Sequence, residues 1–274
     1  MNLPLLPRRR ALAALLAALP IAAASTLGFA AASGTAFADT VPAVLRLGID
    51  PTYPPMDAKA PDGSLKGFDV DLGNEICRRI HAKCQWVEME FSGVIPALQA
   101  RKIDGIMSSM AITEKRMQVI AFSSKLFQFK SRLVARQDSP LAKDVNAMNG
   151  KRIGVQSGTQ FEGYANTHWA PEGAQIVEYK SQDQVFEDLV TGRLDGALLG
   201  TVEADFGFLR TPQGKGFAFV GGPLSMGDHG TGIGLRKDDT ALKSAIDAAI
   251  ASMRQDGTYE RIAHRYFDFD PYGD

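Results

Sequence analysis

The residues best suited to chemistry stand together between Ser108 and Arg116. Ser108 and Ser109 end an apolar run, and Thr113 follows in a pattern that predicts the N-cap of a helix. Arg116 would be the third helical residue, where its guanidinium can turn back towards the two serines. Because a planar fork of donors can hold both oxygens of a carboxylate, this corner predicts a carboxylate-binding site. The alternative is a surface helix whose arginine meets only water.

Catalytic and metal-binding patterns are absent from the sequence. The four histidines are scattered and show neither H-x-x-x-H nor H-E-x-x-H spacing, so we predict no metal site. No G-x-S-x-G motif surrounds a serine, and no glycine-rich phosphate loop is present. Ser108 and Ser109 have no evident histidine partner. We therefore predict no catalytic residue and no cofactor.

The segment from Met1 to Ala38 has the features of a secretory signal peptide. Three arginines at positions 8–10 come before an apolar segment from Ala11 to Ala32, and Ala36-Phe37-Ala38 forms a small-residue cleavage site. The alternative is an uncleaved membrane anchor. The paired arginines leave open whether export follows the general or the twin-arginine route.

Composition and charge are those of an ordinary globular protein. The chain has 274 residues, of which 45% are hydrophobic and 22% charged. The predicted signal peptide carries three arginines and no acid, so its removal moves the formal charge from −1 to −4. This mildly acidic balance argues against nucleic-acid binding, which needs a basic face. No later apolar run approaches the ~18 residues of a membrane span.

Two cysteines, Cys77 and Cys84, stand seven residues apart. In an exported protein this pair predicts a disulfide between the end of a helix and the strand that follows it. The alternative is two buried thiols.

Strand and helix patterns alternate after the signal peptide. Strands are predicted at Val44–Asp50, Trp86–Met89 and Ile103–Met107, with helices opening near Asp69 and Val94. This alternation predicts a parallel sheet with helices on its faces. We expect a loop after the first strand, because the prolines that follow cannot continue it.

A second copy of this plan follows the first. The segment Lys151–Gln156 mirrors Leu45–Asp50, and six residues between Val94 and Gly105 recur between Val185 and Gly196, each 91 positions later. A repeat of this kind predicts two similar α/β lobes.

Ligands of open α/β sheets bind beyond the carboxyl ends of strands. In the first lobe these ends are Asp50 and Ser108-Ser109, and in the second they are Gln156–Thr159 and Leu199–Thr201. Two such edges that face each other would form a cleft suited to a small molecule. Thr159 would cap a helix whose N-terminus points into this cleft.

Four segments, taken together, carry a resemblance. They are Gly48–Pro55, Gly67–Leu72, the Ser-Ser-x-x-Ile-Thr-x-x-Arg stretch from Ser108 to Arg116, and Asp256–Tyr259. They resemble the periplasmic polar amino-acid binding proteins, which are the solute receptors of ABC importers. The similarity is strongest to the branch that binds lysine, arginine, ornithine and histidine, and it extends to Asp270.

The resemblance implies an α/β, two-lobed periplasmic-binding-protein fold of type II, with two parallel-type sheets, flanking helices and a two-crossing hinge. The first lobe would span positions 39–127 and 231–274, the second lobe positions 132–222, and the hinge crossings positions 128–131 and 223–230. It also implies a periplasmic monomer that works with an inner-membrane ABC permease and binds a small molecule. The cysteine pair stands where that branch has its disulfide.

The resemblance further implies roles for single residues. Arg116 would hold the ligand's carboxylate, helped by the helix end at Thr159. Tyr53 and Phe91 would sandwich the ligand's side chain, and Asp50 would face its cationic head. Hydroxyl or carbonyl contacts would come from Ser108 and Ser109. The other ligand-binding residues that we predict are Met110, Ala111, Gln156, Gly158, Gln160 and Gly200.

Three positions depart from that branch. It usually has a serine where this chain has Ala111, an aspartate that binds the ligand's α-ammonium where this chain has Gly200, and Ser-Thr-Gln in place of Thr159–Phe161. A buried ammonium without a partner is costly. We therefore expect a ligand with a carboxylate and a cationic far end but an altered or missing α-amino group. The alternative is that Glu203 supplies the lost charge; otherwise Glu203 is a solvated helix residue.

We thus predict a non-catalytic receptor for a basic amino acid or a related cationic carboxylate. The alternative is an enzyme similar to the cyclohexadienyl dehydratases, in which Asp50 or Glu203 would be the tuned acid or base. A third reading is a sensory ligand domain, against which the lack of a signalling segment argues.

Overall fold

The computed structural model describes residues 41–273, so the predicted signal peptide lies outside the described residues. Two five-stranded sheets, each with its own helices, form two lobes, and a third sheet has three short strands. Within residues 41–273, every helix is too short or too polar to cross a membrane.

The sheet of the first lobe has the strand order β5-β1-β6-β13-β7. Its strands are β1 (Val44–Ile49), β5 (Lys83–Glu88), β6 (Gly105–Ile106), β7 (Ala121–Phe122) and β13 (Gly234–Leu235). Strand β1 runs parallel to β5 and β6, whereas β13 is antiparallel to β6 and β7. The sheet is therefore mixed, because a strand from near the end of the chain inserts into the parallel part.

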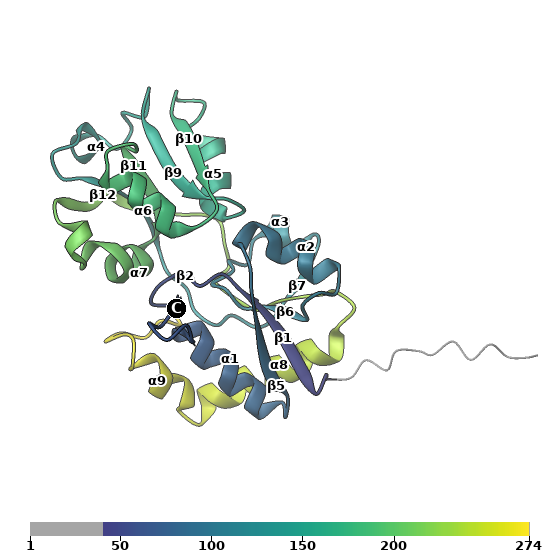
Figure 1. Ribbon diagram of the computed structural model, residues 1–274. Coiled ribbons are helices and arrows are strands. Elements are labelled where there is room, and N and C mark those ends of the chain that lie inside the picture. The colour runs from purple at the N-terminus through teal and green to yellow at the C-terminus, as the bar shows by residue number, and fades with distance from the viewer. Residues whose placement is uncertain (1–40, 274) are drawn as a thin grey trace, which may run out of the picture. The chain divides into compact units, whose positions relative to one another are not determined.

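Helices cover both faces of this sheet (Figure 1). The helical elements are α1 (Phe68–Arg79), η1 (Phe91–Gly93), α2 (Val94–Gln99), α3 (Glu114–Met117), α8 (Thr240–Gln255) and α9 (Thr258–Ala263). Leu45 and Leu47 of β1 pack with residues of α1, α8 and α9 in one apolar cluster. Full burial of such a leucine contributes about 1.5–3 kcal/mol. Helix α2 packs on β1 and β6 and belongs to a separate cluster.

The second lobe repeats this arrangement with the strand order β10-β9-β11-β8-β12. Its strands are β8 (Ser131–Arg136), β9 (Arg152–Gln156), β10 (Gln175–Tyr179), β11 (Gly196–Gly200) and β12 (Phe217–Leu224). Its helical elements are α4 (Pro140–Lys143), α5 (Gln160–His168), α6 (Gln182–Val190), α7 (Thr201–Ala204), the π-turn η2 (Asp205–Leu209) and η3 (Pro212–Gly214). Strand β9 is parallel to β10 and β11, and β8 is antiparallel to β11 and β12.

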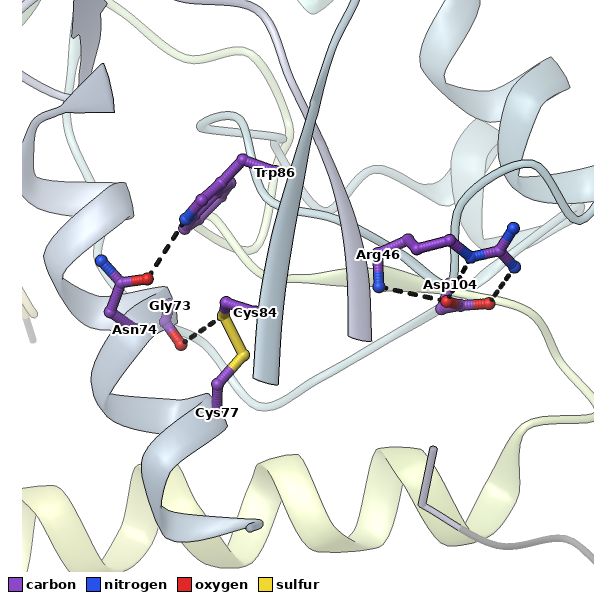
Figure 2. Close-up of a disulfide and its surroundings, with 7 residues drawn as sticks. All are labelled: Arg46, Gly73, Asn74, Cys77, Cys84, Trp86 and Asp104. Carbon is purple, nitrogen blue, oxygen red and sulfur yellow. Dashed lines mark hydrogen bonds and ion pairs between the residues drawn. A yellow bond between two sulfur atoms is a disulfide. The ribbon is translucent and has the colours of Figure 1, made fainter. Parts of the chain in front are cut away.

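The repeated residues have equivalent structural roles in the two lobes. Asp104 accepts a hydrogen bond of 3.1 Å from the backbone nitrogen of Arg46, and Asp195 accepts one of 2.8 Å from that of Arg152. Each aspartate thus connects the first parallel strand of its lobe to the turn before the neighbouring strand, which is β6 in the first lobe and β11 in the second. Figure 2 shows the first of these contacts, in which the Arg46 guanidinium also pairs with Asp104 at 2.7 Å.

The predicted disulfide between Cys77 and Cys84 is present in the structure (Figure 2). It joins the last turn of α1 to the start of β5, and its Cα atoms are 5.7 Å apart. One turn away, the indole nitrogen of Trp86 donates a hydrogen bond of 3.1 Å to Asn74. Helix α1 and strand β5 are therefore fastened at two points.

The loop expected after Asp50 is instead part of a small antiparallel sheet. It consists of β2 (Thr52–Tyr53), β3 (Asp57–Lys59) and β4 (Leu65–Lys66). Strand β1 does end before the prolines that follow Asp50, as expected. The expectation of a loop was wrong only for Thr52–Tyr53, because strands of two or three residues are too short to show an alternating pattern. The boundaries predicted for the lobes and hinge crossings remain a prediction.

Candidate functional site

Strand ends from both lobes meet at a small cavity, here called the head cavity. Asp50 follows β1, Ser108 and Ser109 follow β6, and Gln156 is the last residue of β9. The residues that line the cavity are Asp50, Tyr53, Phe91, Ser108, Ser109, Gln156, Thr159, Gln160 and Phe161. Residues that we predicted from both repeats are therefore brought together, as is usual for the carboxyl ends of parallel strands.

Asp50 is the buried charge of the head cavity and is 5% exposed. Its carboxylate accepts hydrogen bonds from Thr52 Oγ1 at 2.9 Å, from the backbone nitrogen of Phe91 at 3.0 Å and from Gln156 Nε2 at 2.8 Å. Burial raises the pKa of Asp50, and these three donors oppose that rise. The cavity thus presents a fixed carboxylate with a preference for a cation.

A second small cavity, here called the amino cavity, shares Tyr53, Ser109, Gln160 and Phe161 with the head cavity. It is also lined by Ala111 and Gly200, two of the positions at which the sequence departs from the branch that it resembles. The remaining lining residues are Phe127, Phe129, Lys130, Ser131, Glu203, Asp228, Gly230 and Thr231. The two cavities therefore adjoin along common side chains.

Arg116 is buried beside these cavities and is 7% exposed, so the surface-helix alternative is wrong. The side chain of Thr113 caps α3 by accepting a hydrogen bond of 3.3 Å from the backbone nitrogen of Arg116. The guanidinium donates to the carbonyl oxygens of Ala111 at 2.8 Å and Gly158 at 2.9 Å, and it lies 5.4 Å from the ring centroid of Phe91. Burial lowers its pKa to about 10, which still leaves it charged at neutral pH.

The side chain of Arg116 lines an outer groove and neither of the two cavities. Two of the five N–H groups of a guanidinium are engaged by the backbone carbonyls. Since Gly158 belongs to the second lobe, the guanidinium connects the lobes through that carbonyl. The assignment of Arg116 to a ligand carboxylate remains a prediction.

The second helix end at the site is capped as predicted. Thr159 accepts a hydrogen bond of 3.3 Å from the backbone nitrogen of Glu162 and begins α5. The Glu162 carboxylate in turn accepts one of 2.5 Å from the backbone nitrogen of Gly158. The two side chains together satisfy backbone donors at the start of α5.

Three buried carboxylates belong to the site: Glu203 lines the amino cavity, and Asp57 and Asp69 contact the serines that line the cavities. Asp69 accepts hydrogen bonds from the backbone nitrogen of Ser109 at 2.5 Å and from its hydroxyl at 3.1 Å. These bonds hold Ser109 at a φ of +48°, a conformation that few side chains adopt. The Ser108 hydroxyl donates to Asp57 at 3.4 Å.

The pKa values of these three acids are all raised, and burial is the first cause in each. For Asp57 the negative charge of Asp69 adds to the rise. The pKa of Glu203 is raised to about 8 by burial and by the charge of Asp69. Glu203 is only 4% exposed, so the reading of this residue as a solvated helix side chain is wrong.

Three predicted site residues line neither cavity: Arg116 and Gly158, which line the outer groove, and Met110. The Met110 side chain is 1% exposed and packs in the apolar cluster that contains Phe91 and Val94.

Sequence reasoning in turn missed Asp57 and Asp69 at the site. Asp69 could have been predicted, because an acid between two apolar residues in the first turn of a helix faces the same packed environment as its neighbours.

Among residues 41–273, no group of three or more histidine, cysteine or acidic residues is arranged to hold a metal ion. The polar groups at the site are buried carboxylates, hydroxyls and one guanidinium, which can recognise charge.

Comparisons with known proteins agree with this geometry. Residues 45–269 match the family model of the bacterial extracellular solute-binding proteins, family 3. The chain is 47% identical over 257 residues to the histidine-binding periplasmic protein of Salmonella typhimurium, covering 92% of this chain and 98% of that protein. It is 48% identical over 252 residues to the lysine/arginine/ornithine-binding periplasmic protein of Escherichia coli K12, covering 90% and 95%.

A solved structure of an ancestral arginine-binding protein bound to arginine is similar as well. It superposes with a TM-score of 0.78 at 30% identity, and the match covers 82% of this chain and 99% of that one.

Proposed function

The chain belongs to family 3 of the bacterial extracellular solute-binding proteins, and from this premise we propose that it captures a basic amino acid in the periplasm for an ABC importer. Two similar proteins are named for binding histidine and for binding lysine, arginine and ornithine, and a similar structure holds arginine. The ligand class and the location are carried over from these relatives.

The charge balance at the cavities is the observation that carries this proposal. The carboxylates of Asp50 and Glu203 line the head and amino cavities, and the buried cation beside them is Arg116. Lys130 and Asp228, which also line the amino cavity, offset each other. A basic amino acid carries two cationic groups and one carboxylate, so it complements such a site.

The proposed contacts follow from these positions. Asp50 takes the cationic head in the head cavity, and Tyr53 and Phe91, which both line that cavity, flank the side chain. Arg116, with the helix end at Thr159, takes the carboxylate, since charge-assisted forks are the strongest polar contacts available.

We further propose an inner-membrane permease as partner, a monomeric state, and the removal of the segment Met1 to Ala38 on export. Closure of the two lobes over the ligand would create the surface that a permease distinguishes from the empty receptor.

The enzyme alternative has less support. The relatives above are named as binding proteins. A carboxyl group with a raised pKa, as in Glu203, is what a dehydratase acid would need, yet an unpaired buried carboxylate awaiting a cation has the same property. Incubation with prephenate or arogenate should give no turnover.

A ligand panel tests the proposal. Thermal unfolding and calorimetry should be measured with arginine, lysine, ornithine and histidine, and with glutamine and glutamate as neutral and acidic controls. A ligand present at 100 times its Kd stabilises the folded state by about 2.7 kcal/mol, so a cognate basic amino acid should raise the melting temperature clearly. A response to glutamate alone would refute the assignment of a basic ligand.

A further inference from the structure

Gly200 and Glu203 occupy one space at the end of β11. A Cβ atom added to Gly200 would collide with the carboxylate of Glu203 and would lie 3.2 Å from the hydroxyl of Tyr53. The backbone at Gly200 has φ −67° and ψ 147°, which any residue can adopt. The backbone therefore does not require a glycine here, and the space that a side chain at position 200 would take is filled by the carboxylate of Glu203 from the next turn of the chain.

One oxygen of the Glu203 carboxylate is unsatisfied in this position, although a hydrogen bond with Tyr53 lowers the pKa of the group. Its Oε2 atom is buried and has no hydrogen-bond partner among the described residues. Leaving such a group unpaired is expensive, and a charged one more so. Because Glu203 lines the amino cavity, a cation that enters this cavity can supply the missing partner.

The order of the charges matches the order of groups in a basic amino acid. Asp50 lies in the head cavity, and Glu203 lies in the amino cavity, beyond the shared wall of Tyr53 and Ser109. Ala111, whose carbonyl oxygen accepts from Arg116, lines the amino cavity as well. The guanidinium thus contacts a residue of the amino cavity, Ala111, and lies 5.4 Å from the ring of Phe91, which lines the head cavity.

We propose that the Glu203 carboxylate, seated in the space left by Gly200, is the acceptor for the ligand's α-ammonium group and makes the site selective for free α-amino acids. This inference rests on the proposed function and deepens it. It replaces the expectation of an altered or missing α-amino group, because the structure provides the negative charge that position 200 lacks.

The surroundings of Glu203 favour a cation over a neutral group. Asp57, Asp69 and Tyr53 face it from β3, α1 and β2, and the charges of Asp69 and Glu203 disfavour each other. The other charged side chains of the amino cavity are Lys130 and Asp228. An ammonium group placed at Glu203 would relieve this repulsion, whereas a neutral substituent would leave it in place.

A comparison of two ligands isolates this contact. Arginine and 5-guanidinopentanoate differ only in the α-ammonium group, and calorimetry should show that the protein binds arginine at least roughly 30-fold more tightly. Glu203→Gln keeps the size of the side chain and removes its charge. It should weaken arginine binding at least roughly 30-fold and change 5-guanidinopentanoate binding by less than about threefold. Glu187→Gln, on the exposed face of α6, is the matched control and should change neither.

Relocation of the carboxylate gives a second, independent readout. In Gly200→Asp/Glu203→Ala the longer side chain is removed and a shorter acid is placed in the vacated space, so arginine binding should return to within about tenfold of the original. Nα-acetylarginine, which lacks the α-ammonium charge, should bind the unaltered protein as weakly as 5-guanidinopentanoate does.

Each other outcome overturns the inference. Equal loss of both ligands in Glu203→Gln would show a structural role for this residue, and unchanged arginine binding would place the ammonium elsewhere. Tight binding of Nα-acetylarginine would restore the expectation of a substituted amino group. If the unaltered protein binds none of the basic ligands, the proposed function itself fails, and the inference with it.

Discussion

Gln156 donates a hydrogen bond of 2.8 Å from its side-chain nitrogen to the carboxylate of Asp50, although the two residues end strands of different lobes. Both side chains are buried, at 4% and 5% exposure. The amide therefore supports the carboxylate without neutralising it, because an amide contributes a donor and no charge. This pairing holds the Asp50 carboxylate at the head cavity, where its negative charge is available to a cationic group.

Asp50→Asn should reduce the selectivity for a cationic head. Citrulline has nearly the shape of arginine but a neutral head, so the original protein should prefer arginine strongly. Removing one partner of a buried charged contact costs about 2–5 kcal/mol. We therefore expect the binding free energy of arginine to weaken by that amount, while that of citrulline changes little. Competition calorimetry measures both. Asp138→Asn, at an exposed position, is the control, and equal losses for the two ligands would argue against a role for Asp50 in head recognition.

Arg116→Ala should weaken arginine binding by about 2–5 kcal/mol, since the ligand's carboxylate would lose its buried cationic partner. The neighbouring Lys115→Ala changes an exposed cation on the same short helix and should leave affinity unaltered. Because Arg116 also links Ala111 to Gly158 through carbonyl contacts, thermal unfolding of the ligand-free variants is needed to separate fold from binding. Unchanged affinity in Arg116→Ala would place the carboxylate at another group.

Gly158→Ala should impair closure of the lobes. Gly158 has φ +79°, and a Cβ atom there would lie 2.9 Å from the Cα atom of Ser92 in the first lobe. The clash arises only when the lobes are as close as they are in this structure. Overpacking should therefore disfavour this arrangement by about 1–3 kcal/mol and weaken arginine binding by a similar amount. The left-handed backbone adds a stability cost of about 1–2 kcal/mol.

A second glycine of the same segment provides the control. Gly163 lies within α5, and a Cβ atom there would meet nothing within 4 Å. Gly163→Ala should leave affinity alone and stabilise the helix by about 0.5–1 kcal/mol. If both alanine variants bind arginine equally well, the contact with Ser92 does not limit closure.

The parts of this architecture that repeat along the chain were open to prediction. The mirrored segments Leu45–Asp50 and Lys151–Gln156 located equivalent strand ends, and Asp50 and Gln156, which lie at these two ends, do share one cavity. The other buried acids of the site were not predicted in the same way. Glu203 lies in a four-residue helix whose residues 202–204 are all buried, so no periodic pattern separates an inward from an outward face.

Asp57 and the small sheet that carries it were missed for a related reason. Strands of two or three residues are held by their neighbours and not by their own pattern, so their position follows from tertiary packing alone. Met110, which lies between Ser109 and Ala111 in sequence, was predicted to bind ligand. Its side chain instead packs in the apolar cluster that contains Phe91 and Val94.

The stability of the ligand-free protein should fall as pH rises from about 5 to 8. The pKa of Glu203 is raised to about 8 in the folded protein from an ordinary value of 4.5, so over this range the folded state binds more protons than the unfolded state. The stability that Glu203 contributes is complete below its pKa in the unfolded state and is lost as pH approaches its pKa in the folded state. The free energy of unfolding falls by at most about 1.4 kcal/mol per pH unit for each such group. The raised pKa values of Asp57 and Asp69 act in the same direction.

Urea denaturation at pH 5, 6, 7 and 8 measures this slope. Acids with lowered pKa values, such as Glu75 and Asp256 at about 2, stay ionised across the range and do not contribute. Glu203→Gln should flatten the slope, and saturating arginine should do the same in the original protein, because an ammonium partner favours the ionised carboxylate. For the same reason binding should release a proton, so that arginine affinity rises by up to about tenfold per pH unit below pH 8. Identical slopes in the original and Glu203→Gln proteins would mean that Glu203 is already ionised when the site is empty.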